Sequence, residues 1–176
     1  MYDRRVTLDS TLRDVRRSTE GPGSRLGRRL SLVLLLLLVV AAAIGAFGVH
    51  SATVSDRANG YLLGVTYPRT ARAGLDVPFT AHVQHTGGFP SSLTLAISTE
   101  YFRMFETQGF YPDADSATND GRFVYLTFTA PHGDTFVMDF DAYIQPSAQL
   151  GKSATVKLIV RGSTVATVRL HTWLVP

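Results

Sequence analysis

The chain has 176 residues, of which 45% are hydrophobic and 18% are charged, and it contains no cysteine. Its length leaves room for one globular domain and a modest appendage. The absence of cysteine excludes a disulfide scaffold, a thiolate zinc site, a cysteine-ligated iron–sulfur cluster and cysteine catalysis. The formal net charge of +3 is unevenly distributed, because residues 1–30 hold eight arginines against four carboxylates, whereas residues 51–176 hold nine basic against ten acidic side chains. The basic charge therefore belongs to a short N-terminal arm.

Residues 1–29 form this basic arm. Leu8, Leu12 and Val15 recur at helical spacing over about two turns, and a Gly-Pro-Gly sequence at positions 21–23 interrupts any such helix. Two interpretations follow, a polar tail that only fixes topology or a short interfacial helix that touches anionic lipid or a partner. The arm has no interleaved aromatic residues and the rest of the chain is slightly acidic, so we expect no nucleic-acid partner.

Residues 30–49 are twenty consecutive residues without a charge. As a helix they would be about 30 Å long, which matches the hydrocarbon core of a bilayer. Three arginines stand between positions 25 and 29, and the first charges after the run, at positions 56 and 57, cancel. The positive-inside rule therefore predicts a single-pass protein of the cell membrane, with a cytoplasmic N-terminus and an extracytoplasmic C-terminal domain.

A cleaved secretory signal is the alternative interpretation of the same run. Ala46-Phe47-Gly48 fits the small-x-small pattern of a cleavage site. The apolar run is longer than the usual core of a signal peptide and the arm before it is long, so a retained anchor is favoured.

The outer half of the run is rich in small residues. Ala41 and Gly45 are four positions apart, and Gly48 follows. Small residues at this spacing let a second helix approach closely in lipid, so Ala41, Gly45 and Gly48 are predicted to contact a membrane partner. The competing explanation is that Ala and Gly are simply acceptable in an apolar helix and are frequent because the coding sequence is GC-rich.

Residues 50–60 are polar and turn-rich and are predicted to be a linker, and residues 61–176 are predicted to be an all-β domain. Apolar and polar residues alternate in runs separated by breaks that contain Gly and Pro, which is typical of antiparallel strands with one wet face. The seven predicted strands are Leu62–Tyr67, Val77–His85, Leu93–Ser98, Phe123–Thr129, Thr135–Ile144, Ala154–Val160 and Thr164–Leu174.

About seven short strands in this length are typical of an immunoglobulin-like sandwich. With this strand spacing and the G-x-x-V-x-F sequence at Gly74–Phe79, residues 61–176 resemble the immunoglobulin-like domains that bacteria attach to membrane anchors. The resemblance implies a fold, a single transmembrane helix followed by an immunoglobulin-like β-sandwich, and no activity.

Residues 99–121 interrupt the sandwich pattern with a dense group of aromatic residues. Ser98 or Thr99 is placed to cap a helix of one or two turns, and Phe102 and Phe105 would then share one helical face. A helix that plugs the core is one interpretation. The other is an exposed patch in which Tyr101, Phe102 and Phe105 contact a partner.

The sequence offers little chemistry. His82 and His85 are three apart in a predicted strand and point to opposite faces, which is a poor arrangement for a shared metal. The loop 113–120 lacks the glycine and glutamate of an EF-hand, so calcium is a minor alternative there. Asp139 and Asp141 share a wet strand face, and catalysis by this pair is likewise a minor alternative. We expect no enzyme activity, cofactor, metal or small-molecule substrate.

These observations predict a non-catalytic accessory or assembly subunit of a larger integral membrane protein complex, whose partners are integral membrane proteins and membrane lipid. The alternative function is an envelope-anchored module that binds a small ligand, a glycan or a metal ion.

Overall fold

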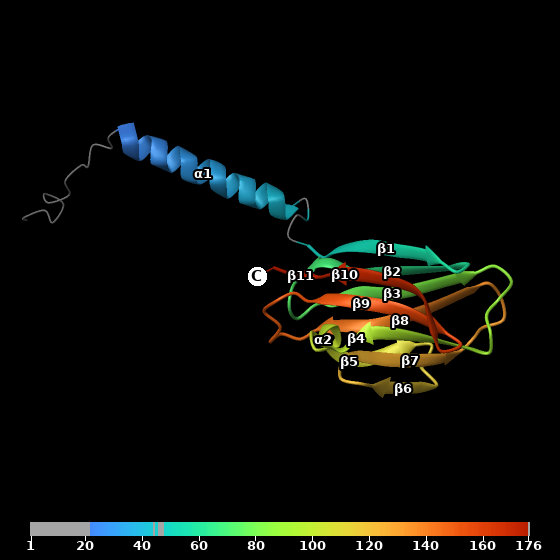
Figure 1. Ribbon diagram of the computed structural model, residues 1–176. Helices are drawn as coiled ribbons and strands as arrows, with labels where there is room; N and C mark the ends of the chain where they lie inside the picture. Colours follow the sequence, from blue (N-terminus) through green and yellow to red (C-terminus); the bar gives the residue numbers. More distant parts are fainter. Residues whose placement is uncertain (1–21, 44, 46–47, 176) are drawn as a thin grey trace, which may run out of the picture. The chain divides into compact units, whose positions relative to one another are not determined.

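The computed structural model describes residues 22–43, 45 and 48–175, and the chain divides into two units, residues 1–46 and residues 47–176. The N-terminal unit contains helix α1 (Pro22–Ala43) (Figure 1). Residues 1–21, which include most of the predicted arm, lie outside the described residues. The second unit is a β-domain.

Helix α1 is displaced toward the N-terminus relative to the prediction. It begins at Pro22, whose fixed φ and missing N–H suit the first turn of a helix, and it ends at Ala43 rather than continuing to position 49. Its segment Gly23–Ala43 is long and apolar enough to cross a membrane. The prediction of an apolar spanning-length helix is therefore confirmed, and its predicted bounds are wrong.

The β-domain consists of two sheets that are antiparallel apart from one short strand (Figure 1). The first sheet has the order β1 (His50–Ala58), β2 (Tyr61–Ala71), β3 (Asp76–His85), β8 (Thr135–Ile144) and β5 (Phe105–Tyr111), and β11 (Trp173–Leu174) pairs in parallel with β2. The second sheet has the order β10 (Ser163–His171), β9 (Ser153–Val160), β4 (Ser92–Ser98), β7 (Phe123–Thr129) and β6 (Ser116–Asn119).

One hydrophobic core joins the two sheets. Val65 and Met138 of the first sheet and Leu95 and Leu158 of the second are completely buried and belong to the same cluster. Burial alternates residue by residue along β8 and β9, because successive side chains of a strand point to opposite faces. The period-two pattern therefore identified the inner faces correctly, and the predicted bounds of β7 and β8 are confirmed.

The predicted linker at residues 50–60 is wrong, because its residues form strand β1. Ala52 and Val54 pack against the core, and the Asp56 carboxylate accepts the backbone N–H of Thr167 (2.8 Å). The strand turns into β2 through Asn59-Gly60, both with positive φ. This is the residue pair that a two-residue hairpin favours, so a hairpin signal was present in a segment whose polarity suggested a linker.

Three further strands account for the remaining difference between the seven predicted strands and the eleven in the described residues. Strand β5 lies in the aromatic insertion and β6 in the acidic loop. Strand β11 arises because the predicted strand Thr164–Leu174 is split after His171. The predicted short helix after Ser98 is confirmed as α2 (Thr99–Phe102).

The split after His171 takes the chain from one sheet to the other. Strand β10 pairs with β9 in the second sheet, and two residues later Trp173 pairs with Thr70 of β2 in the first. Thr172 stands at the crossing, and its backbone N–H donates to the carbonyl of Lys152 (3.0 Å). Gly151 lies directly against this crossing, because a Cβ at Gly151 would overlap the Thr172 carbonyl oxygen and come within 2.9 Å of its carbon.

We therefore expect Gly151→Ala to lower the stability of the β-domain. The Cβ meets backbone atoms that cannot rotate away, which predicts a loss of about 3 kcal/mol and a fall in Tm of about 10 °C. Thermal unfolding of the full chain in detergent, followed by circular dichroism, measures this. The matched control is Gly109→Ala, whose Cβ would meet only the Tyr111 ring, at 3.8 Å. Equal Tm values for the two variants would contradict the close approach.

Candidate functional site

The residues of the aromatic insertion that were predicted to contact a partner are mostly inside the domain. Tyr101 is 1% exposed and Phe105 is 3% exposed. The Phe105 ring lies edge-on to the rings of Tyr101 (5.1 Å between centroids) and Phe140 (5.5 Å). The prediction that Tyr101 and Phe105 contact a partner is therefore wrong, because these side chains complete the core.

Phe102 lies at the edge of the same cluster. It is half-buried, and its ring stands edge-on to Phe140 and Phe110. Phe105 begins strand β5 instead of continuing the helix, so the predicted helical face shared by Phe102 and Phe105 does not form. The exposed aromatic residue of this segment is Tyr111, at 65%. Spacing alone did not distinguish its exposure from the burial of its neighbours.

The small residues predicted to contact a second helix are not on one helical face. Ala41 lies in the last turn of α1, whereas Gly45 and Gly48 follow its end. Gly45 has a φ of 74° and donates its N–H to the carbonyl of Ala42 (3.0 Å), as expected of a glycine that terminates a helix. The predicted packing face formed by Ala41, Gly45 and Gly48 is therefore wrong.

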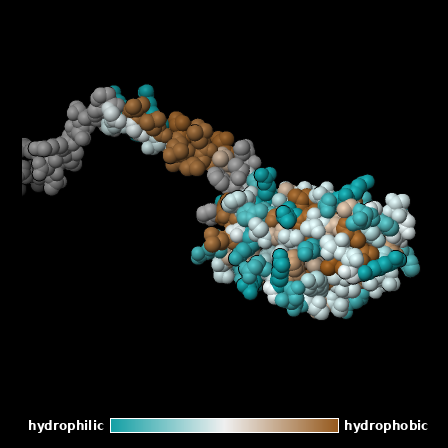
Figure 2. Space-filling model, viewed as in Figure 1, coloured by the Kyte–Doolittle hydropathy of each residue, from teal (hydrophilic) through white to brown (hydrophobic). Residues whose placement is uncertain are grey.

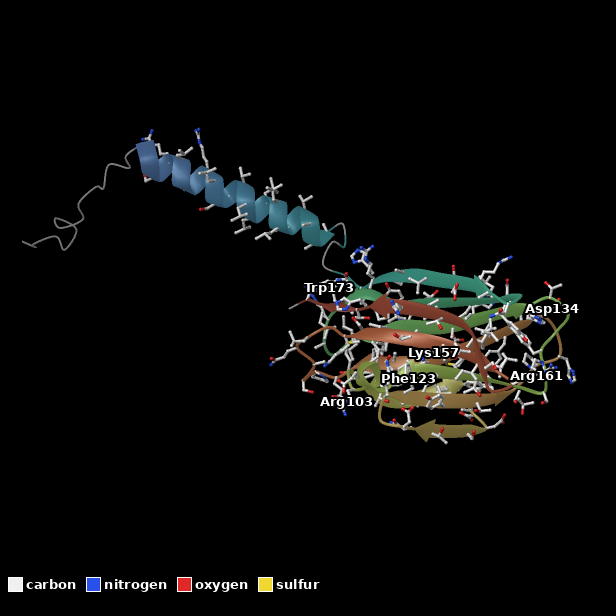
Figure 3. The ribbon with its side chains drawn as sticks, in the orientation of Figure 1. Arg103, Phe123, Asp134, Lys157, Arg161 and Trp173 are labelled. Carbon is white, nitrogen blue, oxygen red and sulfur yellow. The ribbon has the colours of Figure 1, made fainter. Side chains whose placement is uncertain are left out.

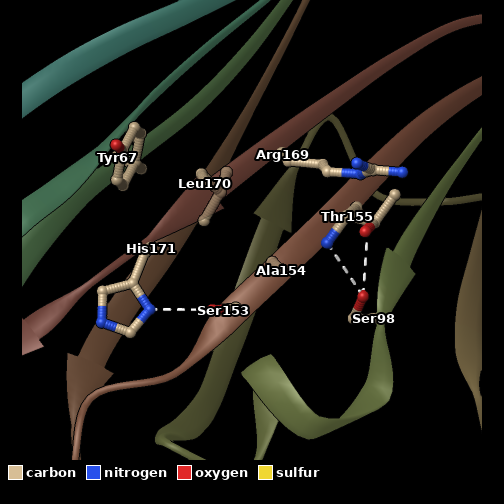
Figure 4. A pocket seen from close by; sticks show the side chains of 8 residues that line it. All are labelled: Tyr67, Ser98, Ser153, Ala154, Thr155, Arg169, Leu170 and His171. Atoms are coloured by element: carbon tan, nitrogen blue, oxygen red, sulfur yellow. Dashed lines mark hydrogen bonds between the residues drawn. The ribbon is translucent and has the colours of Figure 1, made fainter.

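A groove of about 420 Å³ lies where β9, β10 and the end of β4 come together (Figure 4). The strand register places His171 opposite Ser153 and Arg169 opposite Thr155, so polar side chains from two neighbouring strands line it side by side. The lining residues are Tyr67, Ser98, Ser153, Ala154, Thr155, Arg169, Leu170 and His171.

Hydrogen bonds hold two sides of this groove. His171 Nδ1 and Ser153 Oγ are 2.8 Å apart. Ser98 Oγ accepts the N–H of Thr155 (2.9 Å) and donates to its carbonyl oxygen (3.3 Å), as Figure 4 shows. Ser98 therefore connects β4 to β9. Ser98 was one of the two residues predicted to cap α2, but its side chain makes no capping hydrogen bond.

His171 carries a polar atom without a partner. Its Nε2 is buried and makes no hydrogen bond to the described residues. A buried unpaired nitrogen is costly. The hydroxyls and the Arg169 guanidinium of the groove suit an anionic or hydroxyl-rich ligand. The eight lining residues include no carboxylate, so the Ser153–His171 pair lacks the acidic group that orients the histidine of a catalytic triad.

The acidic loop uses its carboxylates to hold its own backbone. Asp120 accepts the N–H groups of Phe123 (2.6 Å) and Arg122 (2.8 Å) and the Tyr125 hydroxyl (2.9 Å). These bonds lower the pKa of Asp120, and the bond to Asp120 raises the pKa of Tyr125. Asp115 likewise accepts a backbone N–H of strand β7. In the described part of the chain, no three His, Asp or Glu side chains gather as metal ligands.

One buried polar pair anchors α2 to the strand crossing. The Tyr101 hydroxyl and Thr172 Oγ1 are 2.8 Å apart, and both side chains are buried. Burial raises the pKa of Tyr101 well above its ordinary value, against the smaller opposing effect of the hydrogen bond. The hydroxyl therefore stays protonated and can share this bond at any physiological pH.

We expect Tyr101→Phe and Thr172→Val each to cost about 1 to 2 kcal/mol, because each leaves the other hydroxyl buried without a partner. The double variant should lose less than the sum of the two, by about 1 kcal/mol. Chemical unfolding of the full chain in detergent measures the cycle. Strictly additive losses would show that the two hydroxyls do not interact.

Comparisons with known proteins identify no family for this chain. No family model and no curated protein matches it. Among solved structures, it is similar to the Pseudomonas fluorescens alkylpurine DNA glycosylase AlkC bound to DNA containing an abasic site analog, with a TM-score of 0.31 and 11% identity. That match covers 70% of this chain and 29% of the glycosylase chain. A likeness at this level carries no argument about fold or function.

Proposed function

We propose that this chain is a single-pass membrane protein, anchored by α1 with its N-terminus in the cytoplasm and its β-domain outside. We further propose that it serves as an accessory or assembly subunit of a larger integral membrane protein complex. The observation that carries the anchor is the surface of α1, which is apolar and has no cover within the described chain.

The large apolar side chains from Leu26 to Val40 are each between 47% and 62% exposed. Figure 2 shows the apolar residues as one continuous surface on the helix. Exposed leucines on all sides are unfavourable in water and favourable in lipid. Arg25, Arg28 and Arg29 lie in the first turns of the helix, and the last turn has no basic residue. This asymmetry supports a cytoplasmic N-terminus.

The strand order supports an immunoglobulin-like architecture for the β-domain. In that fold, strands A, B, E and D form one sheet and C, F and G the other. Strands β2, β3, β8 and β5 take the places of A, B, E and D, and β10, β9 and β4 take those of G, F and C. Strands β1, β6, β7 and β11 are additional to these seven, and β5 precedes β7 in the chain, so the connections differ from those of antibody domains.

The proposed role is bivalent docking. With α1 in the same bilayer as its partner, the β-domain meets that partner at a high effective concentration, so a weak contact is sufficient. Tyr111 is the exposed aromatic side chain at the end of edge strand β5, which pairs only with β8 among the described strands. Aromatic side chains and unpaired strand edges are both favourable contact sites for proteins.

The full chain with an N-terminal tag, expressed in its own host, should stay in the membrane fraction after washing at alkaline pH. Extraction in mild detergent should then recover a stoichiometric integral membrane partner, identified by mass spectrometry. Tyr111→Ala should weaken that recovery, because it truncates the exposed ring. Val137→Ala, which truncates an exposed apolar side chain near the start of β8, is the matched control. A lone monomer would contradict the subunit role, and a shortened chain free in the medium would contradict the anchor.

A second candidate function is an envelope-anchored module that binds a small ligand. The groove at Ser153 and His171 favours it, since it combines hydroxyls with a guanidinium. The chemistry of these donors suits a sugar acid or a phosphate.

This function predicts that glucuronate or inorganic phosphate raises the Tm of the full chain in detergent. A ligand at one hundred times its Kd adds about 2.7 kcal/mol to stability. Arg169→Gln should abolish the rise, whereas Arg57→Gln, far from the groove, should preserve it. A Tm unchanged by both compounds, or a rise that persists in Arg169→Gln, would remove the support for this function.

A further inference from the structure

One end of the β-domain, which we call the His50 end, is formed by four segments that are distant in sequence. Strand β1 starts at His50, which is opposite Thr70 in the register. Trp173 pairs with the same Thr70, and the Val175 N–H donates to the carbonyl of Ala71 (2.9 Å). The loop 145–152 joins them through the bond between Lys152 and Thr172. Figure 3 labels Trp173 at this end and Asp134 and Arg161 at the opposite end.

Large apolar side chains are exposed at the His50 end. Leu150 is 76% exposed, Trp173 is 62% and Leu75 is 41%. A hollow of about 400 Å³ beside them is lined mainly by further apolar residues, at positions 73, 146, 148, 149, 174 and 175. The Trp173 ring is held in place, because it lies edge-on against the imidazole of His171 at 4.4 Å. Exposed Leu and Trp gathered in this way are typical of an interaction surface.

Basic side chains surround this apolar surface. The segments 69–76, 145–153 and 171–175 contain Arg69, Arg72 and Lys152 against one carboxylate, Asp76. Both arginines are exposed. The neighbouring α2, the start of β5 and the turn 119–122 add Arg103 and Arg122 against Glu100, Glu106 and Asp120. Glu100 pairs with Arg103 (2.5 Å) and lies 3.7 Å from Lys152. The His50 end as a whole therefore keeps a small basic excess, which Arg69 and Arg72 supply.

The opposite end has the reverse charge. Its turns and loops, at residues 57–61, 85–92, 111–116, 129–135 and 160–163, hold two arginines against three aspartates. The β-domain is therefore polarised, with an apolar and basic surface at one end and an acidic surface at the other.

The His50 end is also the one through which the chain arrives from α1. Seven Cα–Cα steps separate Ala43 from His50, so the chain allows at most about 25 Å between them. When α1 spans a bilayer, the headgroup region is the surface that remains within this reach. Tryptophan is enriched at that depth, and arginine and lysine there bind anionic headgroups while their stems cover apolar surface.

We propose that the His50 end rests on the headgroup region of an anionic bilayer, with Trp173, Leu150 and Leu75 inserted and Arg69 and Arg72 bound to lipid phosphates. The proposal depends on the proposed anchoring by α1. The contact holds the β-domain upright on the membrane and directs the acidic end outward. It also places the Ser153–His171 groove, which lies at the same end, close to the lipid surface.

Trp173 is the single tryptophan of the chain, so its fluorescence reports on this surface alone. The full chain with an N-terminal tag is reconstituted in vesicles of phosphatidylcholine with or without phosphatidylglycerol, some carrying lipid brominated high in the acyl chain. Flotation with the vesicles reports on the anchor. The expected result is flotation in both vesicle types, with blue-shifted emission that brominated lipid quenches more strongly when phosphatidylglycerol is present.

The variant Arg69→Glu/Arg72→Glu tests the charges. Each basic residue near an anionic membrane favours the lipid-bound position of the β-domain about 5-fold, so loss of both arginines weakens that binding about 30-fold. The two added glutamates weaken it further. Quenching in anionic vesicles should fall to the level in phosphatidylcholine alone. The matched control Arg57→Glu/Arg161→Glu, at the opposite end, should quench as the wild-type chain does. Circular dichroism confirms that both variants are folded.

The two proposals fail in different ways. Flotation with red-shifted, unquenched emission would overturn the lipid contact and leave the anchor standing. Blue-shifted emission that brominated lipid does not quench would show that a second copy of the chain covers Trp173, which also overturns the lipid contact. Loss of flotation would overturn the anchor itself. Equal quenching in the two double variants would overturn the role of Arg69 and Arg72.

Discussion

The crossing of the chain from the second sheet to the first, at Thr172, is the constraint on which both the Ser153–His171 groove and the exposed Trp173 depend. Thr172 is the buried polar side chain of the described core, and its hydroxyl meets that of Tyr101 from α2. Its backbone meets Gly151 and Lys152 at a distance that leaves no room for a side chain on residue 151. A buried polar group is costly unless it is hydrogen-bonded, so the crossing, α2 and the loop 145–152 stabilise one another.

The crossing also decides which sheet and which surface His171 and Trp173 belong to. His171 still belongs to β10 and turns toward Ser153, where it lines the groove. Trp173 already belongs to β11, and its ring is exposed at the His50 end. The residues on either side of the buried Thr172 therefore belong to two different surfaces: His171 lines the polar groove and Trp173 lies on the apolar surface at the His50 end.

The aromatic insertion has a structural role that follows from the same requirement. Tyr101 and Phe105 fill the end of the core next to the crossing, with Phe140 and Phe79 as their neighbours. Large aromatic side chains contribute most when they are buried. Among the described aromatic side chains, Tyr111 and Trp173 are the ones that remain exposed outside this cluster.

Period-two alternation determined most of the strands and their inner faces, because a half-buried strand has to alternate. It failed where burial is partial, since the exposed side chains of β1 and β6 resemble those of a linker and a loop. The uncharged run of residues determined that an apolar helix exists, yet its end at Ala43 was decided by the backbone of Gly45. The groove was not predictable, because Ser98, Ser153 and His171 are far apart in sequence and meet only through strand pairing. Only the tertiary structure decided which aromatic side chains are exposed, because whether Tyr101 or Trp173 faces water depends on which segment of the folded chain covers it.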